Sequence, residues 1–309
     1  MLDPRQWFRR VQVEPAATSS MIPGAAGLTQ DWSSGWPGWL WWFQLAALVA
    51  PLILVSGTIV WSGVPDRLLD GDAALLEIFT QGAVDGEQFT GPYSRFGFNH
   101  PGPAYLYLLA PLYALTHGSA SSLFLTASLI NVVALLAAAM ILRKTCPPVV
   151  AAWGMLLLAL FGHQLGGILF DVWNPWVTIL PFSVAMLAFA GIASGQLALL
   201  PWAIAFASFT VQSHVGYALV LSVGGAYAVM ARAMAAAPAA LSAHAFRFGA
   251  KGRRVLAASL VLAALFWVAP LWDQFARTGN LSSLVRFFTH SQPEISWGQA
   301  WQTFKLVTS

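Results

Sequence analysis

The chain has 309 residues, of which 58% are hydrophobic and only 9% are charged. A soluble domain carries about 25% charged residues, so this composition excludes a disordered chain and argues strongly against a soluble enzyme. The formal net charge is +3, and the single cysteine excludes both an internal disulfide and a cysteine-based zinc site. The composition predicts an all-α, polytopic membrane protein whose 15 tryptophans and 20 phenylalanines are typical of aromatic belts at the bilayer surface.

Long uncharged runs predict about seven transmembrane helices, because a span needs roughly 20 apolar residues. Gly, Pro and polar residues divide these runs into spans expected at 39–61, 121–142, 149–167, 175–193, 197–213, 215–231 and 255–272. Residues 1–37 are expected to form a cytoplasmic N-terminal tail, 38–272 the transmembrane module, and 273–309 an outer-face segment. The last segment ends without a closing element, as expected of a piece of a longer protein.

One apolar segment, 102–117, is ambiguous. It is short, contains Pro103 and Pro111, and carries three tyrosines, a composition typical of a helix lying at the membrane interface. If it does not span and the N-terminus is cytoplasmic, ten of the 15 Lys and Arg residues lie inside, whereas only six do if it spans. The positive-inside rule therefore predicts that this segment lies flat on the outer face.

The first outer loop, expected at 62–120, holds half of the 12 acidic residues. Acidic residues contribute little to membrane orientation, so their clustering suggests a site. Asp70 and Asp72 stand at the start of a short predicted helix that runs to about Thr80. A single aspartate at such a position is usually an N-cap for free backbone N–H groups. This explanation accounts for one carboxylate but not for the pair.

The second half of the loop, YSRFGFNHPGP, carries Tyr93, Arg95, Asn99 and His100 in a turn before a helix whose start is favoured by proline. A purely structural turn is one explanation, with His100 satisfying a local carbonyl. The other is that Arg95 and His100 offer charge or hydrogen bonds to an anionic headgroup at the membrane surface. The residues leave both explanations open.

Two further outer turns carry polar side chains. Asp171 lies in a long stretch otherwise without charge and is followed by Asn174, while His214 stands in the stretch QSHVGY. An ionisable residue at such depth is a functional hypothesis by default. The plainer alternative is that Asp171 caps the next helix, that Trp173 and Trp176 belong to the aromatic belt, and that His214 is a packed polar residue.

No nucleotide-binding glycine loop, HExxH or CxxC motif is present, so nothing indicates a nucleotide or a structural metal. No cofactor is certain. A divalent cation such as Mg or Mn is a candidate if Asp72, Asp171 and His100 converge, since carboxylate oxygens are suitable ligands.

Taken in order, these features resemble the GT-C superfamily of membrane glycosyltransferases. The resemblance is to the bacterial branch related to protein O-mannosyltransferases and aminoarabinose transferases. It covers about residues 60–300 and is carried by the stretches GDAALLEI, YSRFGFNHPGPAYLYLLAPLYAL, DVWNPWVTILPF and QSHVGY.

The resemblance implies a hexosyl- or pentosyltransferase of the bacterial inner membrane, with a cytoplasmic N-terminus and an active site on the outer face. Such enzymes pass a sugar, with inversion, from a polyprenyl-phosphate donor to a hydroxyl or amine of a glycan, lipid or protein acceptor. Nucleic acid is not an expected partner. The family's first acidic residue matches Asp72, with Asp70 beside it, and its second matches Asp171.

The chemistry suits that implication. A carboxylate can act as general base on the acceptor hydroxyl. Arg95, His100, or an outer arginine such as Arg277 or Arg286, can stabilise the departing phosphate. Tyr93, Asn99, Asn174 and His214 complete the expected substrate-binding set. Two alternatives stay open, namely a transporter or flippase for a lipid-linked polar solute and a non-catalytic membrane assembly subunit. Transporters more often place ionisable residues and broken helices near the midplane, in repeated halves.

Overall fold

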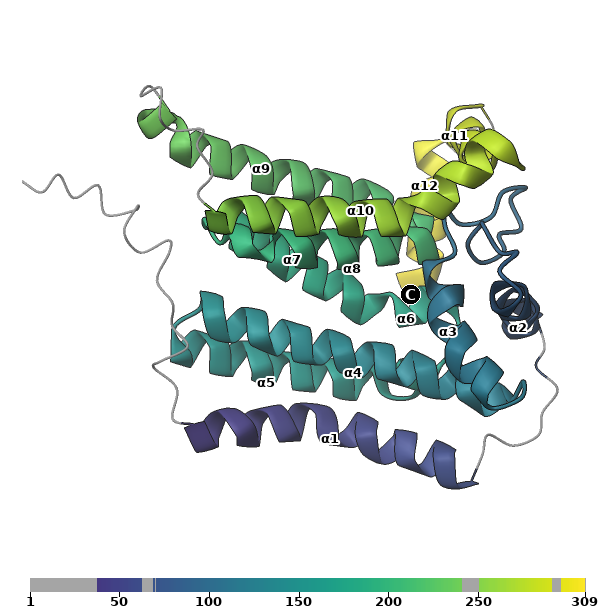
Figure 1. Cartoon of the computed structure of the whole chain (residues 1–309), viewed down its shortest axis with the longest axis horizontal. Helices are drawn as coiled ribbons and strands as arrows, with labels where there is room; N and C mark the ends of the chain where they lie inside the picture. The colour runs from purple at the N-terminus through teal and green to yellow at the C-terminus, as the bar shows by residue number, and fades with distance from the viewer. Residues whose placement is uncertain (1–37, 63–68, 70, 241–249, 291–295, 309) are drawn as a thin grey trace, which may run out of the picture.

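The computed structural model describes residues 38–62, 69, 71–240, 250–290 and 296–308, and every regular element among them is a helix (Figure 1). The predicted N-terminal tail 1–37 and Asp70 lie outside the described residues. Six helical segments are long and apolar enough to cross a membrane: α1 (Gly38–Ser62), α4 (Ala120–Thr145), α5 with η4 (Pro148–Phe170), α6 with α7 (Asn174–Ala193), η6 with most of α9 (Val215–Ala235), and α10 (Ala250–Ala276).

The seventh predicted span, 197–213, has the expected bounds but is divided into two helical pieces. It forms η5 (Leu197–Leu199) and α8 (Leu200–Ser213). At 1.5 Å per residue, the 14 residues of α8 extend about 21 Å, less than the roughly 30 Å of a hydrocarbon core. This helix packs against α7 (Ile179–Ala193) and α10. By length and composition the structure therefore supports six spans, with α8 as a shorter apolar helix among them.

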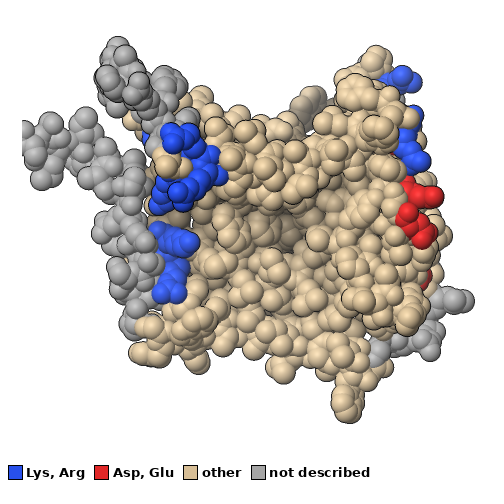
Figure 2. Space-filling view, in the orientation of Figure 1, with Lys and Arg blue, Asp and Glu red and all other residues tan. Residues whose placement is uncertain are grey.

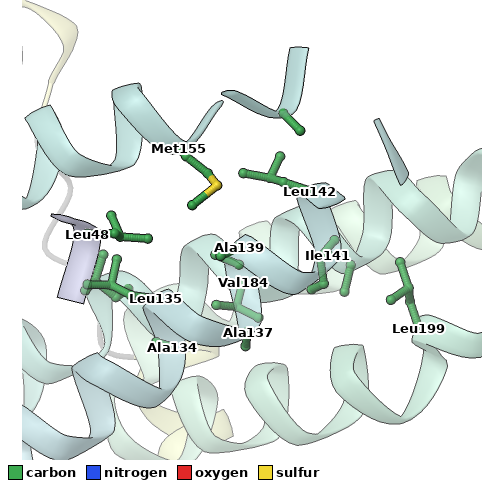
Figure 3. Packing of buried hydrophobic residues seen from close by; sticks show 14 of the residues in the cluster. Leu48, Ala134, Leu135, Ala137, Ala139, Ile141, Leu142, Met155, Val184 and Leu199 are labelled. Atoms are coloured by element: carbon green, nitrogen blue, oxygen red, sulfur yellow. The ribbon is translucent and has the colours of Figure 1, made fainter. Parts of the chain in front are cut away.

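The bundle is centred on α4, the most deeply buried of the six segments, with 61% of its apolar window inside the protein. Small side chains at Ala134, Ala137, Ala138 and Ala139 line its buried face. Figure 3 shows how larger residues of neighbouring helices pack around these alanines. Because helices in a bilayer associate through close packing, a stripe of small residues suits a central helix.

The helices form two groups. One contains α1, α4 and α5, and the other contains α7, α8, α9 (Ala218–Ala240) and α10, while α4 also packs on α7 (Figure 1). Between the groups lies an apolar groove of about 340 Å³, whose walls include Leu129, Val133, Phe206 and Phe266. Figure 2 shows it as a hollow in the middle of this face.

The two ends of the bundle differ in charge. The last turn of α4 carries Arg143 and Lys144, and the first turns of α10 carry Lys251, Arg253 and Arg254. Figure 2 shows Lys and Arg side chains at both ends of the bundle, whereas the acidic side chains visible in this view lie at one end only. The charge pattern thus separates a basic end from an end that holds the long loops.

The loop-bearing end is closed by short helices and turns, which we call the end cap (residues 71–119, 166–178, 214–217 and 277–290). Its helices are α2 (Gly71–Val84), α3 (Ala104–Leu115), α6 (Asn174–Val177) and α11 (Asn280–His290), and a further helix, α12 (Trp297–Thr308), follows them (Figure 1). The ambiguous segment 102–117 therefore contains a 12-residue helix, α3, which is too short to span and packs on α2, α4 and α8.

Candidate functional site

A cavity of about 750 Å³ lies in the end cap. Its walls come from five separate parts of the chain: the start of α2, the loop before α3, the turn that leads into α6, the α8–α9 junction, and α11. The lining side chains are mainly aromatic, with a few polar groups among them: Asp72, Tyr93, Ser94, Arg95, Phe96, Phe98, His100, Trp173, Asn174, Trp176, His214, Phe287 and Phe288. Such a mixture is typical of a ligand-binding site.

Trp173 links the two aspartates that the sequence singled out. Its indole Nε1–H donates to Asp72 Oδ2 at 2.7 Å, and its backbone N–H donates to Asp171 Oδ1, also at 2.7 Å. Asp72 is in the first turn of α2 and exposed to the cavity, whereas Asp171 is half-buried and does not line it. The indole holds one carboxylate oxygen of Asp72 and leaves the other for a ligand.

The turn that carries Asp171 is supported from below by α3. Tyr105, which is fully buried, donates its hydroxyl hydrogen to the Val172 carbonyl oxygen at 2.8 Å. Burial, together with the nearby negative charge of Asp171, raises the pKa of the Tyr105 hydroxyl well above its usual range. Tyr105 therefore stays protonated and acts as a fixed donor that positions the aspartate-bearing turn.

The loop before α3 is held by backbone contacts at close range. The His100 N–H donates to the Pro92 carbonyl, and the Gly91 N–H donates to the His100 carbonyl, each at 2.9 Å. A Cβ atom at Gly91 would lie 2.6 Å from the carbonyl oxygens of Gln212 and Gly102. Only glycine fits at this position, because real Cβ atoms essentially never approach other atoms so closely.

Asn280, the first residue of α11, clamps the same loop from the other side. Its Oδ1 accepts a hydrogen bond from the Asn99 N–H at 2.8 Å, and its Nδ2 donates to the Asn99 and His100 carbonyls at 3.0 and 3.3 Å. Buried Asp273 in turn accepts hydrogen bonds from the Asn280 N–H and from the Thr278 hydroxyl. The Asp273 carboxylate thus satisfies the first backbone N–H of α11. The clamp brings Phe287 and Phe288 of α11 over the cavity.

Two histidines meet in the wall of the cavity. The rings of His100 and His214 are 4.8 Å apart, and His214 Nδ1 is 3.4 Å from His100 Nε2. Burial, with a smaller contribution from His214, lowers the pKa of His100 to about 3, and burial also lowers the pKa of His214. Both rings are therefore neutral near pH 7 and act through hydrogen bonds rather than through charge.

Arg95 supplies the positive charge of the cavity. Its guanidinium is exposed and lies 5.3 Å from the centre of the Phe96 ring. Arg277, the other arginine considered from the sequence, points elsewhere: it donates to the Glu87 carbonyl and stacks over Phe89. Neither Arg277 nor Arg286 lines the cavity. Of the three, Arg95 is therefore the arginine that can meet a ligand there.

The predicted site residues are brought together in large part. Six of them line the cavity: Asp72, Tyr93, Arg95, His100, Asn174 and His214. Asn99 does not, because its side chain donates to Thr90 Oγ1 at 3.0 Å and its backbone is held by Asn280. Across the part of the chain that the structure describes, no three His, Cys, Asp or Glu side chains form a group that could hold a metal ion. The set considered for Mg or Mn, Asp72, Asp171 and His100, is not such a group.

Sequence reasoning missed several lining residues. Trp173 and Trp176 were explained as belt residues, yet they pack edge to face with ring centres 5.0 Å apart and line the cavity. Phe287 and Phe288 were not considered at all. The signal that could have pointed to Trp173 is its indole N–H, a donor that usually has a hydrogen-bond partner when the ring is packed; the partner is Asp72, 101 residues away.

Comparisons of the chain with protein-family models, with curated proteins and with solved structures find no match. The features that point to a function are the geometry of the cavity and the apolar, membrane-type bundle beneath it.

Proposed function

We propose that this protein is a membrane glycosyltransferase that moves a sugar from a polyprenyl-phosphate donor to an acceptor hydroxyl or amine. The observation that carries the proposal is the convergence of Asp72, Arg95, His100 and His214 in one cavity at the end of an apolar bundle. A carboxylate and a set of anion-binding groups are the two things that sugar transfer from a lipid phosphate requires.

In this proposal Asp72 is the general base. Trp173 orients its carboxylate through a hydrogen bond of 2.7 Å, so the free oxygen can take the proton of an acceptor hydroxyl as it attacks the anomeric carbon. The bond from that carbon to the phosphate oxygen breaks, and the lipid phosphate leaves with the electron pair. Attack from the face opposite the leaving group inverts the configuration. Arg95 balances the charge that develops on the phosphate.

The aromatic walls suit a sugar. Trp173, Trp176 and Phe288 present flat apolar faces beside Asp72 and Asn174, and a sugar ring has both apolar C–H faces and polar edges. The apolar groove between α4 and α8 offers a place for a prenyl chain, since α3 contributes Leu108 to its wall and also packs beneath the cavity-lining turns. A membrane-embedded donor would thus keep its tail against the bundle.

The charge pattern supports one orientation. The helix ends opposite the cavity carry Arg143 and Lys144 of α4 and Lys251, Arg253 and Arg254 of α10, and basic residues at span ends are typical of the cytoplasmic side. We therefore propose an inner-membrane location in a bacterium, with transfer on the outer face. Donors of this class are already activated, so the reaction needs no nucleotide site on the protein.

The test is transfer of radiolabelled sugar in proteoliposomes from a panel of polyprenyl-phosphate monosaccharides that covers common hexoses and pentoses. Asp72→Asn should lower the rate by about a hundredfold or more, because a general base contributes roughly 10²–10⁴. The matched control is Asp85→Asn, near the far end of the same helix, which should transfer sugar at the wild-type rate. Both variants must insert and unfold like the wild type.

Two outcomes would overturn the proposal. Retained transfer by Asp72→Asn would remove the proposed base. Absence of transfer by the wild type across the panel, combined with translocation of the labelled lipid between leaflets, would favour the transporter alternative. The second readout is obtained from the same proteoliposomes by adding an impermeant periodate, which reaches only outward-facing sugars.

A further inference from the structure

The His100–His214 pair has a fixed direction that follows from its partners. The backbone N–H of Val215 lies 3.2 Å from His100 Nδ1 and donates to it. A nitrogen that accepts such a bond holds no hydrogen, so the neutral His100 ring carries its hydrogen on Nε2. That Nε2–H faces His214 Nδ1 at 3.4 Å and donates to it.

The hydrogen on His100 Nε2 in turn determines which nitrogen of His214 carries a hydrogen. Because its Nδ1 accepts the hydrogen bond from His100, the neutral His214 ring must carry its own hydrogen on Nε2. The pair is therefore a chain that begins at a backbone N–H, runs through His100, and ends in an N–H donor on His214. A histidine with no such partner would exchange freely between its two neutral forms.

The far side of His214 is kept open by a glycine. A Cβ atom built at Gly216 would lie 3.0 Å from His214 Nε2, and both residues line the cavity. The neighbouring Val215 and Gly216 stand just before α9, at the positive end of its helix dipole. His214 Nε2 therefore lies beside Gly216, a residue of the cavity wall that has no side chain.

We propose that His100 is a positioning residue that fixes His214 in its Nε2–H form, and that this N–H donates a hydrogen bond to a phosphate oxygen of the bound lipid. The ligand half of this inference rests on the proposed function. An N–H can only donate, so its partner must accept. Phosphate oxygens accept without competing as donors, whereas a sugar hydroxyl does both. Arg95 on the same cavity provides the charge that the neutral histidine lacks.

The first test is nitrogen NMR of the full chain with ¹⁵N-labelled histidine in lipid nanodiscs at pH 7. The His100 and His214 signals are assigned by their loss in His100→Gln and His214→Gln. Both rings are expected in the neutral Nε2–H form. In His100→Leu, whose side chain has no hydrogen-bond donor, the signal of His214 should shift toward the average of the two neutral forms. A His214 ring that is protonated, or carries its hydrogen on Nδ1, would overturn the positioning role.

The second test uses farnesyl phosphate, inorganic phosphate and farnesol as separate probes. Farnesyl phosphate is expected to move the His214 Nε2 signal, and farnesol is not. An equal shift with inorganic phosphate at the same concentration would overturn the lipid phosphate in favour of free phosphate. Binding of farnesyl phosphate that leaves His214 unchanged would overturn the donation. Absence of binding with the expected ring forms intact would instead count against the proposed function.

Variants separate this role from a structural one. His214→Ala should weaken binding of farnesyl phosphate by about tenfold to a hundredfold, the usual range for a hydrogen bond to a charged group. His214→Gln, whose amide can place an N–H near the Nε2 position, should restore part of it. In that background His100→Gln should have little further effect, because there is no ring left to orient. Independent losses from the two substitutions would contradict the relay.

Gly216→Ala probes the open side of the ring without touching His100. The added methyl group crowds Nε2, so binding should fall while the His214 ring form stays the same. The matched control is Gly167→Ala at the same end of the bundle, where a Cβ atom meets nothing within 4 Å. Unchanged binding in Gly216→Ala would show that the ligand does not approach Nε2.

Discussion

The bundle and the end cap are held together in different ways. In the bundle, alanines of α4 let helices approach closely, and side-chain hydrogen bonds between helices are few, such as that between Ser56 and Ser128 at 2.6 Å. In the end cap, side chains bond to the backbone of segments far away in the chain, as Asn280 does to Asn99. The bundle depends on shape and hydropathy, whereas the end cap depends on individual polar contacts.

The two regions therefore differ in how well they tolerate mutation. Close packing of apolar helices tolerates exchange of one apolar residue for another of similar volume. A polar network in a partly buried site does not, because each unpaired group costs free energy. The end cap therefore concentrates both the polar groups of the cavity and the sensitivity to mutation, and three substitutions and one change of pH test this contrast.

The largest effect is expected from Gly91→Ala in the end cap. The new methyl group meets three carbonyl oxygens that cannot move apart without separating the loop from α8. Overpacking of this kind costs about 2–3 kcal/mol, equivalent to roughly 4–12 °C in the unfolding temperature of a protein this size. The measurement is thermal unfolding in nanodiscs, followed by tryptophan fluorescence.

Gly57→Ala in α1 is the control for that prediction. A Cβ atom there meets nothing within 4 Å, and alanine favours helix over glycine, so the unfolding temperature should stay the same or rise slightly. Equal losses in the two variants would contradict the contrast between bundle and end cap.

The second-largest effect is a loss of folding stability at acidic pH, caused by buried His100. Its pKa is about 3 in the folded protein and near 6.5 when unfolded, so below pH 6.5 the unfolded state binds a proton that the folded state does not. The free energy of unfolding should be constant above pH 6.5 and lower by about 2 kcal/mol at pH 5. His214, whose pKa is lowered as well, acts in the same direction.

A comparison of variants shows whether the pH dependence of the free energy of unfolding comes from the end cap. His100→Gln should flatten the fall in stability between pH 6.5 and 5, even though the variant is less stable overall. Ser128→Ala, a change inside the bundle, should keep the wild-type slope. A slope that survives in His100→Gln would assign the effect to other groups.

Asn280→Ala is expected to come third. It removes hydrogen bonds to the backbone of Asn99 and His100, and leaving such groups unpaired costs about 1–3 kcal/mol. Hydrogen exchange should increase in the loop 90–102 and in α11 together, since Asn280 joins them. Gln274→Ala at the same α10–α11 junction is the control, because half-buried Gln274 forms its hydrogen bonds with Ser282 of α11 rather than with the loop 90–102. Increased exchange confined to α11 would contradict the clamp.

The contrast between the bundle and the end cap also explains how much of each region could be predicted from the sequence. The spans at 39–61, 121–142 and 255–272 are close to α1, α4 and α10, because hydropathy is a local signal. The segment 197–213 has the predicted bounds, but the structure groups it with the shorter apolar helices, packed against α7 and α10. Length alone, not apolarity, separates such a helix from a span.

The site was predicted less completely, for a physical reason. Asp72 was selected as part of an acidic pair at a helix start and through the family resemblance, and Arg95, His100 and His214 as polar residues of outer turns; the structure brings all four to one cavity. The clamp by Asn280 was not predicted, because its partner is 181 residues away and no local pattern records that distance. Trp173 was placed in a belt because tryptophans near a membrane usually have that role; its bond to Asp72 depends on the fold.

The smallest effect is expected from Ser128→Ala in the middle of the bundle. Ser128 is fully buried and bonds to Ser56 of α1, so by burial alone it resembles Asn280. However, hydrogen bonds between membrane helices are worth only about 0.6 kcal/mol on average, and Ser56 Oγ keeps a second partner in the Leu52 carbonyl. The unfolding temperature should fall by about 2 °C or less. If Ser128→Ala instead destabilises the protein more than Asn280→Ala does, then polar contacts hold the bundle as firmly as they hold the end cap, and the contrast between the two regions is wrong.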